Sequence, residues 1–443
     1  MLAGSRRGLD PVRVAVWRCG LRAAKIRSVR LPRMLEPLTI RDFRLLWIGL
    51  SVSLVGDAIL LVALAWQVYE LSNDPTMLGW ILAAYVMPML VFLLLGGVLT
   101  DRFERRKMMI AADVIRAVAI GSAGALALAG TLELWQLALC AALAGVGEAL
   151  FAPAFGSIVP EIVPPELLTQ ANALDQFVRP LASLIGPALA GLLIALSGTG
   201  AALIVDAASF AASSTTALLM APRPFEHKTA RSMRRDLGEG FRFVHTRIWL
   251  WATLAIAALL SIAPAARNVL LPFVVKNDLH ASAAALGAVY SATATGALAS
   301  ALVYGQRGLP RRYVLTMYLA WAIVSFAIAG YGLATGITQL VTLGFLAGLA
   351  TTIGQAIWAT MLHQLVPREL LGRVSSLDWL LSSSLMPISI IIVGFLGEAI
   401  GARTTLLVAG LLAGTLTLLS IAIVPNLRAP EQHTLRQQQV DTD

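Results

Sequence analysis

Several ionisable side chains stand inside long apolar stretches of this sequence. Asp57, Glu148 and Asp206 are carboxylates in such stretches, Asp113 and Arg116 are three residues apart, and Arg267 stands alone. An ionisable group at the centre of a bilayer costs roughly 2.5–3.5 kcal/mol on insertion scales, so membrane proteins keep such groups for ion pathways, ligand binding or internal pairing. A buried carboxylate that gains and loses a proton near neutral pH can couple transport to a proton gradient.

These groups differ in what their positions favour. Asp57 and Glu148 are candidates for proton coupling or substrate contact, with a structural polar contact as the alternative. Asp113 and Arg116 fall on one helix face at a spacing that allows them to pair, and we interpret this pair as mainly structural. Arg267 can attract an anionic substrate or pair with a neighbouring carboxylate, and the sequence does not choose between the two.

Other chemistries lack their motifs in this sequence. A Gly-Lys pair is absent, and with it the phosphate-binding loop of an ATPase. The five histidines are scattered without metal-ligand spacing, and no Gly-x-Ser-x-Gly motif is present. Cys19 and Cys140 lie far apart and predict neither a disulfide framework nor a metal site. We therefore expect no enzymatic activity, no cofactor and no metal.

The composition indicates which elements position the charged groups. Of the 443 residues, 58% are hydrophobic and 13% are charged, and the mean hydropathy is +0.77. That charged share is about half of what soluble domains carry, and roughly 20 apolar residues are enough to cross the hydrocarbon core. Such runs occur twelve times, without the alternation that a membrane barrel requires. They cover residues 43–68, 77–99, 108–129, 134–155, 174–196 and 201–220, then 248–274, 284–304, 314–331, 337–361, 377–400 and 404–424.

This pattern predicts an all-α membrane protein with twelve transmembrane helices in two pseudo-symmetric six-helix halves. The halves are expected at residues 41–220 and 248–425, joined by a cytoplasmic loop at 221–247. Residues 1–40 and 426–443 are expected to be cytoplasmic tails. The first 33 residues carry nine Lys and Arg and lack the apolar core of a secretory signal. They are either a disordered basic tail or sequence upstream of a true start at Met34.

The basic residues predict the orientation. Of the 34 Lys and Arg, 29 lie in the two tails and in alternate connections, whereas the other connections hold only Lys276 and Arg403. Because cytoplasmic loops carry the excess of Lys and Arg, both termini are expected in the cytoplasm. The net charge of +9 is therefore interpreted as a topology signal rather than as a nucleic-acid-binding surface.

An internal repeat supports the division into halves. The segments "VPPELLTQANALD" (Val163–Asp175) and "VPRELLGRVSSLD" (Val366–Asp378) are identical at seven of thirteen positions with an offset of 203 residues. Both follow the fourth predicted helix of their half and lead into the fifth, where a carboxylate meets the positive end of the helix dipole. Parallel repeats of this kind are typical of secondary transporters that alternate access around a site at the midplane.

A dense group of charges follows the second predicted helix, in "GVLTDRFERRK". This stretch resembles the loop signature of the major facilitator superfamily, with matches at Gly97, Leu99, Asp101, Arg102, Arg105 and Arg106 and departures at Thr100 and Glu104. The resemblance implies a conformational latch in which Asp101 engages the start of the helix predicted at residues 377–400, near Ser375 and Asp378, when the cytoplasmic side is closed. The alternative is that the arginines only anchor the topology.

Three further stretches resemble the branch of this superfamily that holds the enterobactin exporter and macrolide efflux proteins. They are "FRLLWIGLSVSLVGDAILLVALAW", "AADVIRA" and "FAPAFGSIVPEIVPPELLTQANAL". The run "GPALAG" partly matches the antiporter signature of the superfamily. That signature implies a bend in the helix predicted at residues 174–196, at Gly186, Pro187 and Gly191. Ala182 and Ala190 replace expected glycines, and close helix packing by small residues is an equally good explanation.

Together these features predict a secondary active transporter of a bacterial inner membrane. Its expected action is proton-coupled efflux of a small amphipathic compound such as a drug, a siderophore or a secondary metabolite. An importer or facilitator of a small metabolite with the same fold is the alternative. The expected partners are the substrate, protons and the lipid bilayer, without nucleic acid, and the chain is expected to be a monomer.

Overall fold

The structure is a computed structural model that describes residues 33–100, 103–222, 241–307, 310–424 and 427. The described residues form helices joined by short turns, and no strand occurs among them. The helices of the first half are α1 (Arg41–Ser72), α2 (Pro75–Thr100), α3 (Arg105–Leu128), α4 (Leu134–Ile162) and α5 (Leu168–Leu218). Those of the second half are α7 (Ile248–Leu260), α8 (Ile262–Phe273), α9 (Ala283–Arg307), α10 (Tyr313–Leu333), α11 (Ile337–Leu365), α12 (Arg368–Ser384), α13 (Met386–Ile400) and α14 (Ala402–Ile423).

Within the described residues, eleven helical segments are long and apolar enough to cross a membrane. One of them contains α5, whose 51 residues include a non-helical backbone at Gly198 (φ 79°, ψ 172°). A positive φ is inexpensive only for glycine, so Gly198 divides α5 into two consecutive helices. Divided there, the segments agree with the twelve that the sequence predicts, and the expected all-helical membrane fold is confirmed.

Two predicted helices are each interrupted once, beside a proline. The helix predicted at residues 248–274 is divided into α7 and α8 after Leu260, and Pro264 lies in the first turn of α8. The helix predicted at residues 377–400 is divided into α12 and α13, and Pro387 is in the first turn of α13. Proline has no N–H to donate to the carbonyl four residues earlier, which explains a break one turn before each proline.

The repeat seen in the sequence is also present in the backbone. The helices α4 and α11 both have 29 residues, and their bounds are separated by the same 203 residues as the repeated segments. Val163 and Val366, which end these helices, have nearly equal dihedral angles (φ −104°, ψ 129° and φ −100°, ψ 130°). Gly198 and Gly401 are another pair at this offset, and both have a positive φ.

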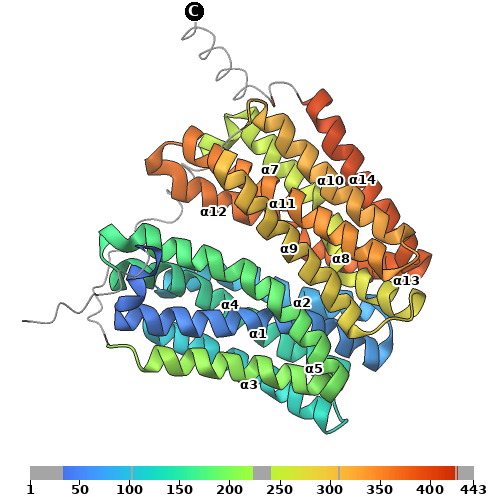
Figure 1. Cartoon of the computed structure of the whole chain (residues 1–443), viewed down its shortest axis with the longest axis horizontal. Helices are drawn as coiled ribbons and strands as arrows, with labels where there is room; N and C mark the ends of the chain where they lie inside the picture. Colours follow the sequence, from blue (N-terminus) through green and yellow to red (C-terminus); the bar gives the residue numbers. More distant parts are fainter. Residues whose placement is uncertain (1–32, 101–102, 223–240, 308–309, 425–426, 428–443) are drawn as a thin grey trace, which may run out of the picture.

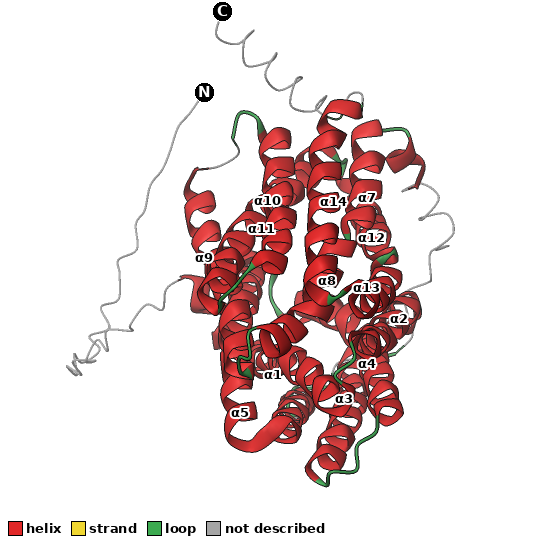
Figure 2. Cartoon of the chain, turned by 90° about the vertical axis from the view of Figure 1, so that its right-hand side faces the viewer, coloured by secondary structure: helices red, strands yellow, loops and turns green. Residues whose placement is uncertain are grey.

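The helices form two bundles that meet at one end and diverge at the other (Figure 1). In the first bundle α5 packs against α1 and α3, and α2 packs against α4. In the second, α9 packs against α11, and α10 packs against α14. The bundles contact each other chiefly through α5 with α9 and α2 with α13, and the view turned by 90° shows the same two groups one above the other (Figure 2).

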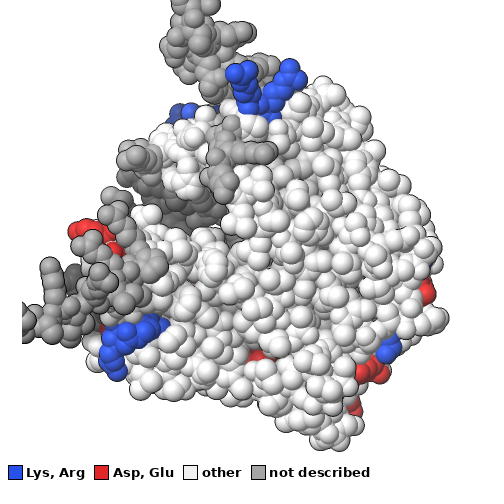
Figure 3. Space-filling model, viewed as in Figure 1, with Lys and Arg blue, Asp and Glu red and all other residues white. Residues whose placement is uncertain are grey.

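The surface in Figure 3 is consistent with a membrane setting. Charged side chains gather near the two ends of this face, and a broad band between them carries almost none. Large apolar side chains such as Leu196, Leu302 and Ile423 are at least 70% exposed. An apolar exterior of this extent is expected where lipid, rather than water, surrounds the helices.

Candidate functional site

The first candidate site is a cluster of charged side chains buried inside the first bundle. Arg116 on α3 is only 2% exposed, and its Nη1 donates a hydrogen bond of 2.7 Å to Oε2 of Glu148 on α4. Its Nη2 donates to Oδ1 of Asp113, which is fully buried. The guanidinium also lies over the rings of Phe151 and Phe210, 4.5 and 4.3 Å from their centroids. The Arg116 guanidinium is therefore the centre of the cluster.

Two further carboxylates belong to this cluster. Asp57 on α1 is half-buried, and Arg116, Glu148 and Asp113 all lie close enough to act on it electrostatically. Asp206 in the second part of α5 is fully buried and interacts electrostatically with Asp57. The structure thus brings Asp57 and Glu148 together with the Asp113–Arg116 pair, a grouping that the sequence alone does not predict.

Glycines provide the space for this cluster. A Cβ at Gly147 on α4 would lie 2.5 Å from Cγ of Arg116 and 2.9 Å from the Ala112 carbonyl oxygen. A Cβ at Gly56 on α1 would lie 2.5 Å from Oδ1 of Asp206. No side chain fits at either position without displacing these charged groups. The glycines beside Asp57 and Glu148 therefore leave the room that the charged side chains occupy.

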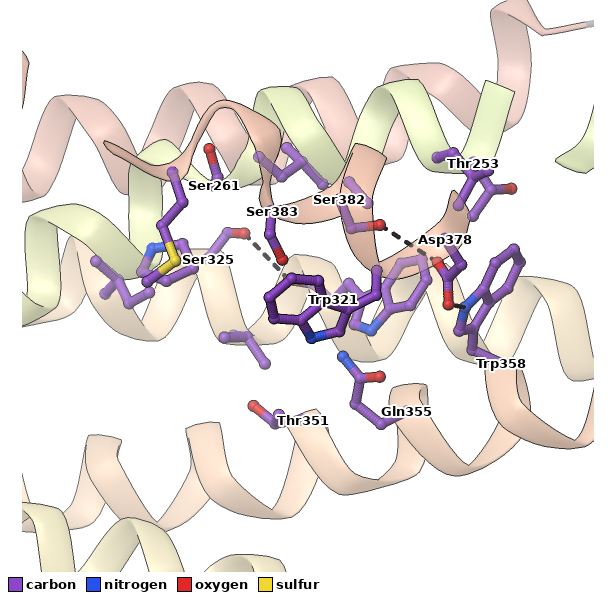
Figure 4. Close-up of a pocket in the computed structure, with 18 of the residues that line it drawn as sticks. Thr253, Ser261, Trp321, Ser325, Thr351, Gln355, Trp358, Asp378, Ser382 and Ser383 are labelled. Carbon is purple, nitrogen blue, oxygen red and sulfur yellow. Dashed lines mark hydrogen bonds between the residues drawn. The ribbon is translucent and has the colours of Figure 1, made fainter. Parts of the chain in front are cut away.

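The second candidate site is a pocket of about 440 Å³ in the second bundle, shown in Figure 4. Asp378 on α12 accepts hydrogen bonds from Nε1 of Trp358 (3.1 Å) and from the hydroxyl of Ser382 (3.3 Å). Trp321 and Gln355 face the same space from α10 and α11. Hydroxyl groups are also part of the lining, supplied by Thr253, Ser261, Ser325, Thr351 and Ser383.

Arg267 on α8 lines this second pocket, far from the cluster in sequence. Its Nε and Nη2 both donate to Oδ1 of Asn268, at 3.2 and 3.1 Å. Tyr290 and Tyr331 are close enough to interact with it electrostatically. Among the described residues no carboxylate forms an ion pair with Arg267.

The repeat predicts a related pocket in the first bundle, and the structure contains one of about 430 Å³. Asp175 and Phe155 line it, and the residues 203 positions later are Asp378 and Trp358 of the second pocket. In this first pocket Nε of Arg179 donates to Asp175 at 3.2 Å, where Ser382 takes the corresponding place in the second. In the sequence, the Leu-Asp pair that ends both repeated segments is the feature that marks these two aspartates as equivalent positions.

The predicted latch lies partly outside the described residues. Asp101 and Arg102 are among those not described, and Gly97 is in the last turns of α2. Arg105 forms an ion pair with Glu161 at the end of α4. Arg106 donates to the carbonyl oxygens of residues 217 and 218, at 2.8 and 2.6 Å, and so satisfies the carboxyl end of α5. These two arginines therefore join helix ends within the first bundle.

Comparison with known proteins identifies the family. A family model described as "Transmembrane secretion effector" matches residues 33–442, which is most of the chain. The chain belongs to this family of the major facilitator superfamily. Macrolide efflux protein A of Streptococcus pyogenes is 26% identical over 387 residues, which cover 86% of this chain and 94% of that protein. Enterobactin exporter EntS of Citrobacter koseri is 28% identical over 344 residues, which cover 76% and 80%.

Solved structures show the same fold at low sequence identity. The nucleoside transporter NupG has a TM-score of 0.66 at 14% identity, and the match covers 86% of this chain and 98% of that one. A bacterial homologue of the iron transporter ferroportin, in an inward-facing state, has a TM-score of 0.62 at 17% identity and covers 85% and 98%. These structures confirm the expected fold, and the family model and the curated relatives confirm the expected membership of the major facilitator superfamily.

The "GPALAG" run of this transporter lies at the contact between the two bundles. The Pro187 carbonyl contacts α9 at Gly287, and a Cβ at Gly191 would lie 2.5 Å from Cα of Ala284 and 3.0 Å from the Ala283 carbonyl oxygen. Gly186 faces α1 in the same way, against the Val55 carbonyl oxygen. The backbone stays helical through this run, since the non-helical angles of α5 are at Gly198. The arrangement favours close packing as the role of these glycines.

We expect Gly191→Ala to weaken transport. The added methyl group cannot fit against Ala283 and Ala284 without separating α5 from α9, and overpacking of this kind typically costs about 1–3 kcal/mol. The rate of substrate transport and the thermal stability of the purified protein should both fall. Gly156→Ala on α4 is the matched control, since a Cβ there meets nothing within 4 Å. Equal behaviour of the two variants would contradict the packing role.

Polar side chains join the two bundles at the end where they meet. Tyr69 donates to Oδ1 of Asn277 and Asn277 donates to Oδ1 of Asn73, both at 2.9 Å. Thr76 at the start of α2 donates to Oε2 of Glu398 on α13 at 2.5 Å. We name these five residues the terminal clasp. Because they belong to opposite bundles, their contacts must break if this end of the transporter opens.

We expect Asn277→Ala to shift the transporter toward a state in which this end is open. The two exposed hydrogen bonds that it removes are worth about 1 kcal/mol together, which corresponds to roughly a five-fold change in the ratio of states. A cysteine placed at Ser383 in the second pocket, with Cys19 and Cys140 replaced by alanine, should react with a thiol reagent at an altered rate. Thr335→Ala, which removes only a local hydrogen bond from the Thr335 hydroxyl to Gln339, should leave that rate unchanged, and an unchanged rate in Asn277→Ala would count against the clasp.

Proposed function

We propose that this transporter exports a small amphipathic compound from the cytoplasm of a bacterial cell in exchange for protons. It would act as a monomer in the inner membrane, with both termini cytoplasmic. The division of the two sites supports this assignment. The first bundle holds ionisable groups suited to proton exchange, and the second holds an aromatic pocket suited to an amphipathic molecule.

The proposal of proton coupling rests on the number of carboxylates near Arg116, which is greater than one guanidinium can neutralise. Asp113 and Glu148 are bonded to this guanidinium, which neutralises one negative charge, and Asp57 and Asp206 interact with it electrostatically. Several uncompensated carboxylates in a low-dielectric interior are costly unless some of them hold protons. Asp57 and Glu148 are both half-buried, but Glu148 is bonded to Arg116. We therefore assign the coupling role to Asp57, with Glu148 as the alternative.

The second pocket supports the substrate class. Three tryptophans, Trp321, Trp358 and Trp379, offer apolar surface, while hydroxyls and Gln355 offer hydrogen bonds in several directions. Arg267 adds a positive charge without a carboxylate partner among the described residues. We therefore propose a largely apolar substrate with a ring system and an anionic or carbonyl acceptor group. The relatives named for macrolide and enterobactin export are consistent with substrates of this class.

The end at which the bundles meet is proposed to face outward. The short connections there contain Lys276 and Arg403, whereas the connections of the opposite end hold most of the basic residues. With this orientation the bundles diverge toward the cytoplasm, and the structure corresponds to an inward-facing transporter. The proposed latch at Asp101 would then form only when the cytoplasmic side closes.

Everted membrane vesicles offer the direct test. An imposed proton gradient, acidic inside, should drive accumulation of a radiolabelled substrate, chosen by screening a deletion strain against macrolides and catechol siderophores. Collapse of the gradient with a protonophore should release the accumulated substrate. Equilibration that is indifferent to the gradient would favour the facilitator, and accumulation only in right-side-out vesicles would favour the importer.

A further inference from the structure

Asp206 is the member of the charged cluster that is most enclosed. Its side chain is fully buried in the second part of α5, and within the described part of the chain it forms no ion pair. The hydroxyl of Ser209 donates to Oδ1 at 3.5 Å, a long hydrogen bond, and Oδ2 has no hydrogen-bond partner among the described residues. A carboxylate so placed has lost its hydration without a compensating cation.

The ionisable groups near Asp206 come from α1, α2 and α3. Asp57 on α1 and Tyr85 on α2 lie close enough to interact with it electrostatically, and Arg116 on α3 is the positive charge that does so. The guanidinium of Arg116, however, is already bonded to Asp113 and Glu148. An ionised Asp206 would therefore face the negative charge of Asp57 while sharing an arginine that two other carboxylates occupy.

The contact at Gly56 connects Asp206 to the proposed coupling residue. Oδ1 of Asp206 lies against the backbone of Gly56, at a place that a Cβ would fill, and Asp57 is the next residue along α1. Asp57 is half-buried, whereas Asp206 is closed off, and the contact at Gly56 makes the Asp57 carboxylate the candidate relay to water for a proton that leaves Asp206. In that transfer the O–H bond of Asp206 breaks, one forms on Asp57, and Asp57 then gives a proton to water.

We propose that Asp206 is a second proton-binding site of the transport cycle, which holds a proton in the conformation described and releases it through Asp57 when substrate binds. This inference rests on the proposed proton coupling and extends it from one carboxylate to two. Ionised Asp206 and Asp57 would repel each other across the contact between α1 and the second part of α5. The packing of these two helices would therefore depend on the protonation state of Asp206.

Asp206→Asn provides the test, because asparagine imitates a carboxylic acid that never loses its proton. Wild-type protein in weakly buffered detergent should release protons when substrate is added, and the variant should release one fewer for each substrate bound. Asp74→Asn, at an external turn where Asn can still cap α2, is the control and should release as many as the wild type. Equal proton release by Asp206→Asn, in a variant that still binds substrate, would overturn the second site.

Infrared spectroscopy decides the matter if Asp206→Asn does not fold. In Asp57→Asn protein, which lacks the proposed release route, a carboxylic acid C=O band should persist when substrate binds. In the wild type the same band should be present without substrate and weaken when substrate binds. The absence of such a band, or a wild-type band indifferent to substrate, would overturn the proposal. A wild-type transporter that shows no proton-driven accumulation in vesicles would instead refute the proposed function, so the two failures are distinguishable.

Discussion

Asp57→Asn vesicles should lose proton-driven accumulation of substrate, by at least about ten-fold, while they still exchange labelled for unlabelled substrate across the membrane. Asparagine has nearly the shape of aspartic acid but cannot gain or lose a proton, so the cycle continues without its driving ion. Exchange needs only the movement of the bundles and should survive. The measurement is uptake into everted vesicles, with and without an imposed gradient.

The position of Asp57 makes this test informative. Its neighbours Arg116, Glu148 and Asp113 belong to other helices, so a change in Asp57 that merely disturbed packing would also lower exchange and thermal stability. Asp74→Asn is again the control for the loss of one carboxylate. Undiminished gradient-driven accumulation in Asp57→Asn would return this residue to a structural role and transfer the coupling assignment to Glu148.

Arg116→Met should be the most destabilising single substitution in the first bundle. Removal of one partner from a buried ion pair costs about 3–5 kcal/mol, because the remaining charge is left uncompensated. Here Asp113 and Glu148 would both lose the guanidinium. The midpoint of thermal unfolding, followed by size-exclusion chromatography of heated samples, should fall by several degrees, and the yield of folded protein should fall with it.

A rescue experiment separates charge from packing. If the loss of charge balance causes the instability, the triple variant Arg116→Met, Asp113→Asn, Glu148→Gln should recover most of the stability, since no uncompensated charge then remains on these three residues. Arg179→Met is the control, because Arg179 is 48% exposed and surface ion pairs contribute little. A stable Arg116→Met protein would show that the cluster is open to water.

Much of the fold could be predicted from the sequence because the bilayer imposes a simple rule on it. The length of each apolar run follows from the hydrocarbon thickness, and the bounds of α4 and α11 differ from the predicted runs by a few residues. The repeat of "VP", "ELL" and "LD" indicated equivalent turns, and the structure confirms nearly equal dihedral angles at Val163 and Val366. The breaks after Leu260 and Ser384 were not predicted, although each precedes a visible proline.

The sites could be predicted only in part, since hydropathy does not specify which helices are neighbours. The spacing of Asp113 and Arg116 indicated that they could pair, and the structure forms that pair. The bond from Arg116 to Glu148 spans 32 positions and depends on how α3 packs against α4. The pocket around Asp378, Trp321 and Trp358 depends in the same way on the packing of three helices, and no local pattern indicated it.

The 203-residue repeat has a consequence for how such a transporter diversifies. The positions that correspond to the charged cluster in the second half are uncharged: Leu260, Thr316, Leu319, Thr351 and Ala409. Conversely, Val118 and Phe155 correspond to Trp321 and Trp358. After duplication of an ancestral six-helix unit, one copy thus kept or gained the ionisable groups and the other the indole-lined pocket. Under the proposed function, selection for a different cargo would change the second copy while the first continues to supply the driving force, so that specificity and energy supply would evolve on separate stretches of one gene.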